Sequence, residues 1–379
     1  MIGRIHVSLP ALRANARALR EVVGPKHAAF VVKSNAYGHG LVETALAVEP
    51  IATKFCTYAL DEAIALRDGG IAAPILVLGP VPHDDLDDAM AAGVELALWN
   101  TGEFARKLAG AARRRQRRAA VHVKVNTGLN RLGFEPHELA DAVEDYLHVS
   151  EIDIAGVFSH LSSAEELDSP ATLRQLEVFE RALAAAEPLF ERSRIVPLRH
   201  IAASAAAMLW PQTRLDLARF GIALYGLWPS SATRDAMEGS AVSLRPALSY
   251  VSEVAVVRTV PAGAPIGYGA SFHAPHEMRV GVIPAGYADG VPRALSNRGA
   301  FLVDGARCPI VGRVAMNVTE IDLSAAPQAR AGSKVTLIGK DGTEEIGAEQ
   351  WAAWCETIAY EIVARLPSGL PRSYDDDER

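Results

Sequence analysis

Short apolar runs alternate with longer amphipathic segments from about residue 28 to residue 226. Several of the short runs are apolar on both faces, which is typical of parallel strands that helices cover on each side. The runs that we expect to be strands are AAFVVKS (28–34), FCTYAL (55–60), PILVLGP (74–80), VELALWN (94–100), VHVKVNT (121–127), IAGVFSHL (154–161), RHIAAS (199–204) and LARFGIALYG (217–226).

The segments between these runs show the 3.6-residue apolar period of helices that pack against a sheet, as in residues 176–190. An opening helix is predicted from about Leu9 to Val23, with Ser8 as its N-cap and Pro10 in its first turn. Eight strands alternating with helices predict an α/β fold, a (β/α)₈ barrel of the TIM type. A doubly wound open sheet is the alternative because the sequence does not give the strand order, although no G-x-G-x-x-G follows the first strand.

The pattern changes after about residue 235, where strand-like runs are separated by Gly/Pro turns and few helical patterns remain. We therefore expect two domains, an α/β barrel (1–235) and a β-rich C-terminal domain (236–379). A strand within Met1–Leu9 can pair with the second domain. The acidic end of the chain, SYDDDER (373–379), is expected to be frayed.

Composition excludes several classes of function. The net charge of −7 gives no electrostatic basis for nucleic-acid binding, and no apolar run approaches the roughly 20 residues that span a bilayer. The N-terminus lacks the features of a signal peptide. The three cysteines are far apart, so we expect neither a disulfide framework nor a metal site, and we expect a cytoplasmic location. The run RRRQRR (113–118) is interpreted as the solvated end of a helix.

Polar residues lie at the ends of several predicted strands, where the active site of a barrel forms. Singly, each has an ordinary structural explanation, such as an N-cap serine or a solvated arginine. Together they fit a lysine that forms a Schiff base with an anionic cofactor, and pyridoxal phosphate is such a cofactor. The residues in question are Lys33, Arg131, His160, Ser204 and Arg219.

Motifs along almost the whole chain, in order and spacing, resemble those of alanine racemases. The combination of V-V-K-x-N-A-Y-G-H-G with R-x-G-I-x-x-Y-G is especially specific. The matching stretches are AFVVKSNAYGHG, KVNTGLNRLGF, the SH of GVFSHL, ASAA, RFGIALYGL, IGYGASF, GYADGVPR, CPIVGRVAMN and AYEIVARL. The resemblance implies a homodimeric pyridoxal-phosphate enzyme that interconverts L- and D-alanine and supplies D-alanine for bacterial cell-wall peptidoglycan.

The same resemblance implies roles for individual residues. Lys33 matches the cofactor lysine, which is also the base for the D-enantiomer, and Tyr268 matches the opposing base, supplied across the dimer interface. Arg219 would face the pyridine nitrogen, Arg131 the phenolic oxygen, and His160 would stand between Arg219 and the ring. The residues that match phosphate ligands are Tyr37, Ser204, Gly221, Ile222 and Tyr360.

On the substrate side, the resemblance implies that Arg131, Tyr268, Met316 and Asn317 contact the amino acid and that Tyr287 lines the entry channel. Lys124 matches a lysine that is carbamylated in many members, and an unmodified lysine is the alternative. Two departures from the common pattern concern ligand contacts. Asn317 stands where the family often has aspartate, and Ala203 replaces the asparagine of A-N-S-A.

Three other functions are alternatives for a chain with these motifs. A broad-specificity amino-acid racemase would share all these motifs. A decarboxylase of the same architecture would have an acidic residue in place of Arg219, and a non-catalytic pyridoxal-phosphate carrier would have the barrel alone. The sequence favours racemisation over the last two.

Overall fold

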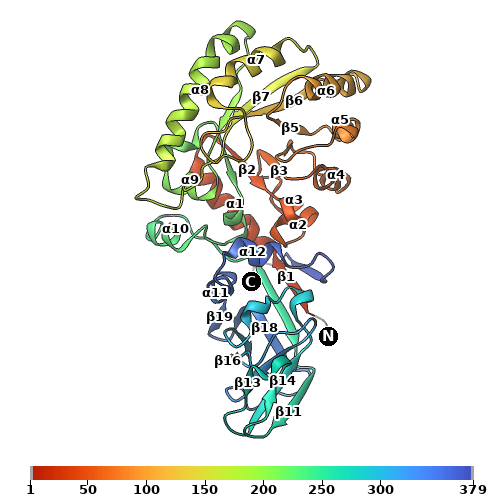
Figure 1. Cartoon of the computed structure of the whole chain (residues 1–379), viewed down its shortest axis with the longest axis vertical. Coiled ribbons are helices and arrows are strands. Elements are labelled where there is room, and N and C mark those ends of the chain that lie inside the picture. Colours follow the sequence, from red (N-terminus) through yellow and green to blue (C-terminus); the bar gives the residue numbers. More distant parts are fainter. Residues whose placement is uncertain (1–2, 377–379) are drawn as a thin grey trace.

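The computed structural model describes residues 3–376 and shows the predicted barrel beside a β-rich domain (Figure 1). The barrel strands are all parallel and follow the order β8-β7-β6-β5-β4-β3-β2-β9. Their bounds are β2 His27–Val31, β3 Lys54–Thr57, β4 Ile75–Val77, β5 Glu95–Leu98, β6 Ala119–Lys124, β7 Ile152–Phe158, β8 Leu198–His200 and β9 Leu217–Phe220.

Backbone hydrogen bonds link the two ends of this sheet. The amide of Asp216 donates to the carbonyl of Arg199, and that of Arg219 donates to the carbonyl of Ala202, each over 3.0 Å. The sheet therefore curls into a nearly closed barrel, and the alternative of an open doubly wound sheet is wrong.

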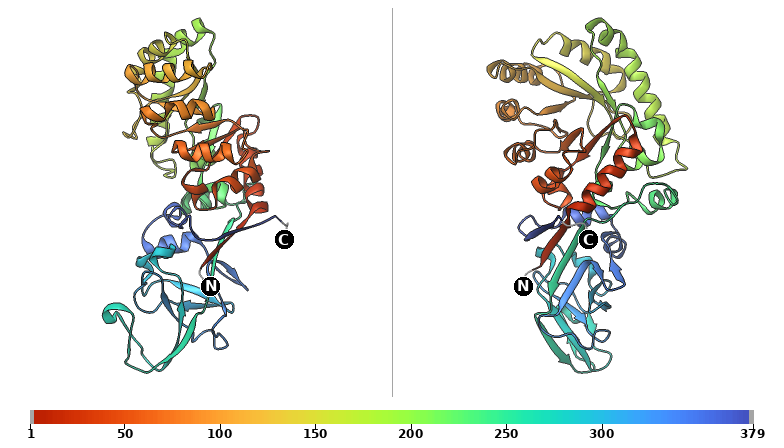
Figure 2. Two further views of the ribbon diagram at one scale, coloured as in Figure 1. Left: turned by 90° about the vertical axis from the view of Figure 1, so that its right-hand side faces the viewer. Right: turned by 180° about the vertical axis from the view of Figure 1, so that it is seen from behind.

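Helices cover the outside of the barrel (Figures 1 and 2). They are α1 Leu9–Val23, α3 Leu41–Val48, α4 Leu60–Asp68, α5 Leu86–Ala92, α6 Glu103–Arg114, α7 Leu139–Leu147, α8 Ala171–Ser193 and α9 Ser204–Leu209. Helix α10 (Ser231–Ala236) projects to one side below α9 (Figure 1). The start of α1 is as predicted, because the Ser8 hydroxyl accepts a hydrogen bond from the amide of Ala11 and Pro10 lies in the first turn. Helix α6 ends in the arginine run, where Arg113 and Arg114 pair with surface carboxylates.

A second sheet is built around the N-terminal strand. The order is β16-β15-β18-β10-β1-β20, with β19 paired to β18. Strand β1 is antiparallel to β10 and parallel to β20, so the first strand of the chain lies within the C-terminal domain (Figure 1). The bounds are β1 Arg4–Ser8, β10 Leu248–Glu253, β15 Ala300–Val303, β16 Ala306–Pro309, β18 Lys334–Asp341, β19 Glu344–Ile346 and β20 Arg372–Asp375.

Strand β20 corrects the expectation that the acidic end is frayed from residue 373. Its residues pair with β1, and Arg372 donates from Nε to the carbonyl of Gly38 over 2.9 Å. The last residues of that predicted segment, 377–379, lie outside the described part of the chain.

The rest of the C-terminal domain consists of short strands and two helices. Strands β11, β14 and β17 form one sheet, and β12 pairs with β13. Their bounds are β11 Val256–Val260, β12 Pro265–Ile266, β13 Phe272–His273, β14 Met278–Ile283, β17 Thr319–Asp322, α11 Ala348–Cys355 and α12 Ala359–Ala364. Within residues 3–376, no helix is long and apolar enough to cross a membrane.

Candidate active site

A cavity of about 640 Å³ opens where the barrel strands end. Apart from Tyr360 on α12, the side chains around it come from the last residues of β2, β6, β7 and β9 and from the residues that follow β2, β3, β4, β6, β7, β8 and β9. The cavity therefore lies at the carboxyl ends of the strands, where barrel active sites form. The structure brings most of the predicted site residues together here. They are Lys33, Tyr37, Lys124, Arg131, His160, Ser204, Arg219, Gly221, Ile222 and Tyr360.

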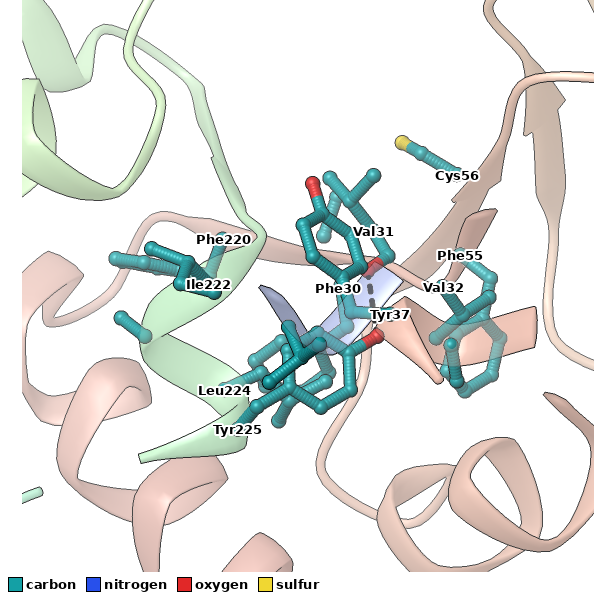
Figure 3. Packing of buried hydrophobic residues seen from close by; sticks show 14 of the residues in the cluster. Phe30, Val31, Val32, Tyr37, Phe55, Cys56, Phe220, Ile222, Leu224 and Tyr225 are labelled. Carbon is teal, nitrogen blue, oxygen red and sulfur yellow. Dashed lines mark hydrogen bonds between the residues drawn. The ribbon is translucent and has the colours of Figure 1, made fainter. Parts of the chain in front are cut away.

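Lys33 stands at the start of an unusual turn, labelled α2 (Lys33–Tyr37), rather than in the strand itself. The backbone of 34–37 is left-handed, with φ from 51° to 56° at four consecutive non-glycine residues. Such a conformation costs about 1–2 kcal/mol per residue, so tertiary contacts must hold it. Figure 3 shows the apolar residues packed beneath it, where the Tyr225 hydroxyl donates to the carbonyl of Val31 over 2.9 Å.

The two glycines after this turn lie against the C-terminal domain. A Cβ atom on Gly38 would clash with the carbonyl of Val363, and one on Gly40 would clash with the hydroxyl of Tyr374. Both glycines have positive φ, 81° and 99°. His39 between them is fully buried, and its Nδ1 is 2.9 Å from the carbonyl oxygen of Tyr37. The GHG turn therefore serves packing between the domains.

Four cations share the cavity without a carboxylate partner. Among residues 3–376, no ion pair involves Lys33, Lys124, Arg131 or Arg219. Burial and then the charge of Arg131 lower the pKa of Lys33, although Glu62 opposes this shift. Burial, followed by Arg131, Arg219 and Lys33, lowers the pKa of Lys124 to about 8. The cavity thus has an excess of positive charge that an anionic ligand would relieve.

Arg219 on β9 is 3% exposed and has several acceptors for its guanidinium. Nη2 donates to the carbonyl of Ser159 over 2.8 Å and lies 3.3 Å from Nδ1 of His160, while Nη1 lies 2.5 Å from Nδ1 of His200. Burial lowers the pKa of Arg219 to about 10. Burial, together with the neighbouring cations, lowers the pKa of His160 to about 3, so this imidazole is neutral at pH 7.

Another part of the cavity is a small polar cradle. The Ser204 hydroxyl accepts a hydrogen bond from the amide of Gly221 over 3.0 Å. A Cβ atom on Gly221 would lie 2.7 Å from the hydroxyl oxygen of Tyr37, so a side chain here would crowd the cradle. The rings of Tyr37 and Tyr360 lie 6.2 Å apart. Ala203, the N-cap of α9, provides no side-chain acceptor.

The remaining predicted residues do not reach this cavity within one chain. Tyr268, Tyr287 and Met316 are exposed in the C-terminal domain, with 74%, 45% and 56% of their surfaces accessible. Two of the segments touch, because the amide of Tyr287 donates to the carbonyl of Ala315 over 2.9 Å. Asn317 donates from Nδ2 to Asp289 over 3.2 Å, and an aspartate at 317 would place two carboxylates together.

Sequence reasoning missed the aromatic rings beneath the cations. Lys33 Nζ lies 5.7 Å from the centre of the Tyr58 ring, and Lys124 Nζ and the Arg219 guanidinium each lie 5.4 Å from that of Phe158. Both rings stand at strand ends, where an aromatic residue in the sequence looks like part of the apolar run that precedes it. Aromatic faces stabilise desolvated cations, so these rings offset part of the electrostatic cost of the site.

Two family models match the chain, the alanine racemase N-terminal domain over residues 7–229 and the alanine racemase C-terminal domain over 247–374. The chain belongs to the alanine racemase family. The alanine racemase of Symbiobacterium thermophilum is 39% identical over 369 residues, which are 97% of this chain and 96% of the relative.

Solved structures of alanine racemases are similar to this chain over nearly its full length. Alanine racemase from D-cycloserine-producing Streptomyces lavendulae is 36% identical, has a TM-score of 0.92, and is matched over 100% of this chain and 98% of that one. Alanine racemase from Bartonella henselae, described with covalently bound pyridoxal phosphate, is 27% identical with a TM-score of 0.86, over 99% and 100% of the two chains.

Proposed function

We propose that this chain is a pyridoxal-phosphate-dependent racemase that interconverts L- and D-alanine. The observation that carries the proposal is the group of four unpaired cations in one cavity, beside a hydroxyl-lined cradle whose glycine leaves room for a ligand. This set of donors fits an aldehyde cofactor with a phosphate group. When bound, pyridoxal phosphate supplies an electron-withdrawing ring that makes the α-proton of an attached amino acid more acidic.

Lys33 is the residue that we assign to covalent attachment of the cofactor. Its lowered pKa increases the fraction of neutral amine, which is the nucleophilic form. Its second role is to move the α-proton on one face of the substrate. The cradle residues Tyr37, Ser204, Gly221, Ile222 and Tyr360 would hold the phosphate.

Tyr268 is the residue that we assign to the proton on the opposite face. Racemisation needs a base on each side of a planar centre, and Tyr268 is 74% exposed and outside the cavity of its own chain. We therefore propose a homodimer in which Tyr268 of one subunit completes the site of the other. The subunit that supplies Tyr268 would also supply Tyr287, Met316 and Asn317. The backbone amide of Met316 would bind the substrate carboxylate.

Arg219 distinguishes racemisation from decarboxylation in this architecture. A guanidinium can only donate, so it leaves the pyridine nitrogen unprotonated and the ring a weaker electron acceptor. An acidic residue in this place would accept a hydrogen bond, keep the pyridine nitrogen protonated and make the ring a stronger electron acceptor. His160, neutral and with its Nδ1 3.3 Å from Nη2 of Arg219, would help to hold that arginine beside the ring.

Lys124 is proposed to be carbamylated. A neutral amine attacks carbon dioxide and releases a proton to solvent as the carbamate forms, and with a pKa of about 8 a substantial fraction of Lys124 is neutral near physiological pH. The carbamate would change a positive charge to a negative one beside Arg131, which would then be oriented toward the phenolic oxygen of the cofactor and the substrate.

The biological role that follows is the supply of D-alanine for bacterial peptidoglycan, in the cytoplasm. All three cysteines are free, which suits a reducing compartment.

The test is an assay of the purified chain with added pyridoxal phosphate against alanine, serine and larger amino acids in both directions. We expect a new absorbance band from the lysine-bound cofactor and the fastest racemisation with alanine. Comparable rates for many amino acids would indicate the broad-specificity alternative, and racemisation of none would contradict the proposal. In addition, Tyr268→Phe should impair removal of the α-proton from L-alanine far more than from D-alanine.

A further inference from the structure

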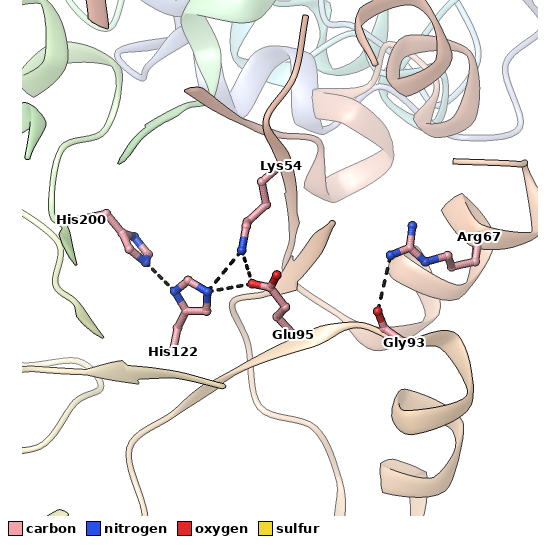
Figure 4. A network of polar contacts seen from close by, with 6 residues as sticks. All are labelled: Lys54, Arg67, Gly93, Glu95, His122 and His200. Atoms are coloured by element: carbon pink, nitrogen blue, oxygen red, sulfur yellow. Dashed lines mark hydrogen bonds and ion pairs between the residues drawn. The ribbon is translucent and has the colours of Figure 1, made fainter. Parts of the chain in front are cut away.

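A row of polar side chains crosses the barrel interior from Glu95, at the amino end of the strands, to Arg219. Figure 4 shows the part of this row from Glu95 to His200, with Lys54 beside it. Glu95 opens β5, and its Oε2 lies 2.7 Å from Nε2 of His122 on β6. Nδ1 of His122 lies 2.7 Å from Nε2 of His200 on β8. Nδ1 of His200 lies 2.5 Å from Nη1 of Arg219 on β9. Three hydrogen bonds thus join four strands.

The two ends of this row determine where its protons lie. Arginine can only donate, so Nδ1 of His200 must accept and the proton of that ring is on Nε2. That proton then points to Nδ1 of His122, which must accept in turn, so His122 holds its proton on Nε2. A carboxylate can only accept, and Glu95 receives this last proton. Every hydrogen bond in the row therefore points from Arg219 to Glu95.

The surroundings keep the row neutral in the middle and charged at its ends. Burial lowers the pKa of both His122 and His200, so both rings are neutral at pH 7. Burial opposes ionisation of Glu95, but the hydrogen bond from His122 and the charge of Lys54 outweigh it and lower the pKa of Glu95 to about 2. The carboxylate is therefore an acceptor throughout the physiological range.

Packing fixes the two rings in place. His200 stacks on Phe158, with ring centres 4.9 Å apart and planes at 6°. A Cβ atom on Gly156 of β7 would clash with the imidazole of His122, so the ring occupies the space that this glycine leaves. Packing therefore prevents either ring from rotating away if two N–H groups face each other.

Because Lys54 stands at the start of β3, the carboxylate of Glu95 is needed to keep the hydrogen bonds of the row pointing from Arg219 to Glu95. Its ammonium pairs with Glu95 and also lies 3.3 Å from Nε2 of His122. A lysine can only donate. Without Glu95, it would donate to Nε2 of His122 and reverse the row, which would place an N–H of His200 against the N–H of Arg219.

We propose that Glu95 is a positioning residue for Arg219, which acts through His122 and His200 by holding both rings in the Nε2–H form. The proton arrangement is a property of the protein alone, whereas its consequence for catalysis rests on the proposed function. Arg219 meets an acceptor at Nη1 only in this arrangement, and its other contacts then aim it into the cavity.

The first test needs no activity. Nitrogen-15 NMR of the cofactor-free protein labelled at histidine distinguishes the Nε2–H from the Nδ1–H form, and spectra of His122→Asn and His200→Asn assign the signals. We expect Nε2–H for both rings in the wild type and in Glu95→Gln, whose amide oxygen still accepts. In Glu95→Leu we expect Nδ1–H. Nδ1–H or a charged ring in the wild type would overturn the proposal.

The second test compares alanine racemisation and cofactor absorbance in four folded proteins. We expect kcat to fall by about tenfold or more in Glu95→Leu and to stay within about threefold in Glu95→Gln. The double variant Glu95→Leu/Lys54→Met, which lacks the reversing lysine, should recover most of the lost activity. Equal losses in all three variants, or no loss in Glu95→Leu, would contradict the proposal.

These two tests separate the inference from the proposed function. If the wild type racemised nothing but showed both Nε2–H forms, the function would be lost and the proton arrangement would stand. If it racemised alanine and Glu95→Leu did so equally well, the role of Glu95 would be lost and the function would stand.

Discussion

Two lysines at opposite ends of neighbouring barrel strands have opposite surroundings. Lys54, at the amino end of β3, is 4% exposed and paired with Glu95. Lys33, just beyond the carboxyl end of β2, has no ion-pair partner within the described residues, and Arg131 adds a second positive charge nearby. The charge of Lys54 is neutralised by a carboxylate within the protein. The charge of Lys33 has no such partner.

This difference shows how one barrel separates structure from function. A buried charge that the fold itself needs is neutralised within the fold, because an unpaired one destabilises it. Unpaired charges are kept at sites where a ligand supplies the missing partner, although they destabilise the fold when the ligand is absent. The four cations at the carboxyl ends of the strands therefore mark the ligand site more clearly than any one of them does.

The largest expected effect comes from Lys33→Ala. We expect racemisation to fall by about a thousandfold or more, because the proposed covalent anchor and one of the two proposed bases are lost together. The melting temperature of the cofactor-free protein should not fall, since no partner of Lys33 is left unpaired. A cofactor-free variant that unfolded readily would contradict the view that Lys33 is free of structural duties.

The opposite result is expected for Lys54→Met. Breaking a buried pair leaves the Glu95 carboxylate without its cation, which should lower the free energy of unfolding by about 3 kcal/mol. Denaturant unfolding of the cofactor-free proteins measures this, with Lys340→Met as a surface control, because the Lys340–Glu345 pair is exposed.

The free energy of unfolding that Lys54→Met loses should depend on pH. The pKa of Glu95 is about 2 in the folded protein, below its usual value of about 4.3, so its charge stabilises the fold above pH 4. Wild type and Lys54→Met should therefore converge in stability as the pH falls from about 4 toward 2. A gap that stayed constant over that range would contradict the electrostatic explanation.

A smaller effect is expected from Gly221→Ala. The added methyl group would lie 2.7 Å from the Tyr37 hydroxyl and would displace it from the cradle. We expect pyridoxal phosphate to bind about tenfold more weakly, which is about 1.4 kcal/mol. Titration of the cofactor by absorbance measures this, and Gly110→Ala on the outer helix α6 is the control. Unchanged affinity would place the phosphate elsewhere.

The smallest effect concerns Lys124. With a pKa of about 8, its neutral fraction rises from about 10% at pH 7 to about 75% at pH 8.5. At a fixed concentration of dissolved ¹³CO₂, carbamate detected by ¹³C NMR should rise by more than the neutral fraction does, because its formation also releases a proton, and it should be absent in Lys124→Arg. A signal that persists in that variant would assign the carbamate to another amine.

The barrel and the polar residues at the ends of its strands could be predicted because both depend on local patterns. Apolar runs define the strands, and a lysine or arginine just beyond such a run stands out. The left-handed turn at 34–37 could not be predicted, since no glycine occupies it and contacts from the C-terminal domain and the apolar layer hold it. Strand β20 was missed because an acidic end pairs only when β1 is beside it.

The row from Glu95 to Arg219 was missed for a related reason. Its members stand on four strands, and only the register of the closed barrel brings them within hydrogen-bond distance. In the sequence, Glu95, His122 and Arg219 are each a single polar residue inside an apolar run, and His200 follows Arg199.

The measurement that tests the central claim most directly mixes Lys33→Ala with Tyr268→Phe subunits after reversible dissociation. If Tyr268 completes the site of a second chain, each mixed dimer holds one intact site, and an equal mixture should reach about a quarter of wild-type activity. If the mixture shows no more activity than the two variants alone, Lys33 and Tyr268 do not form a site between two chains, and the proposed arrangement is contradicted.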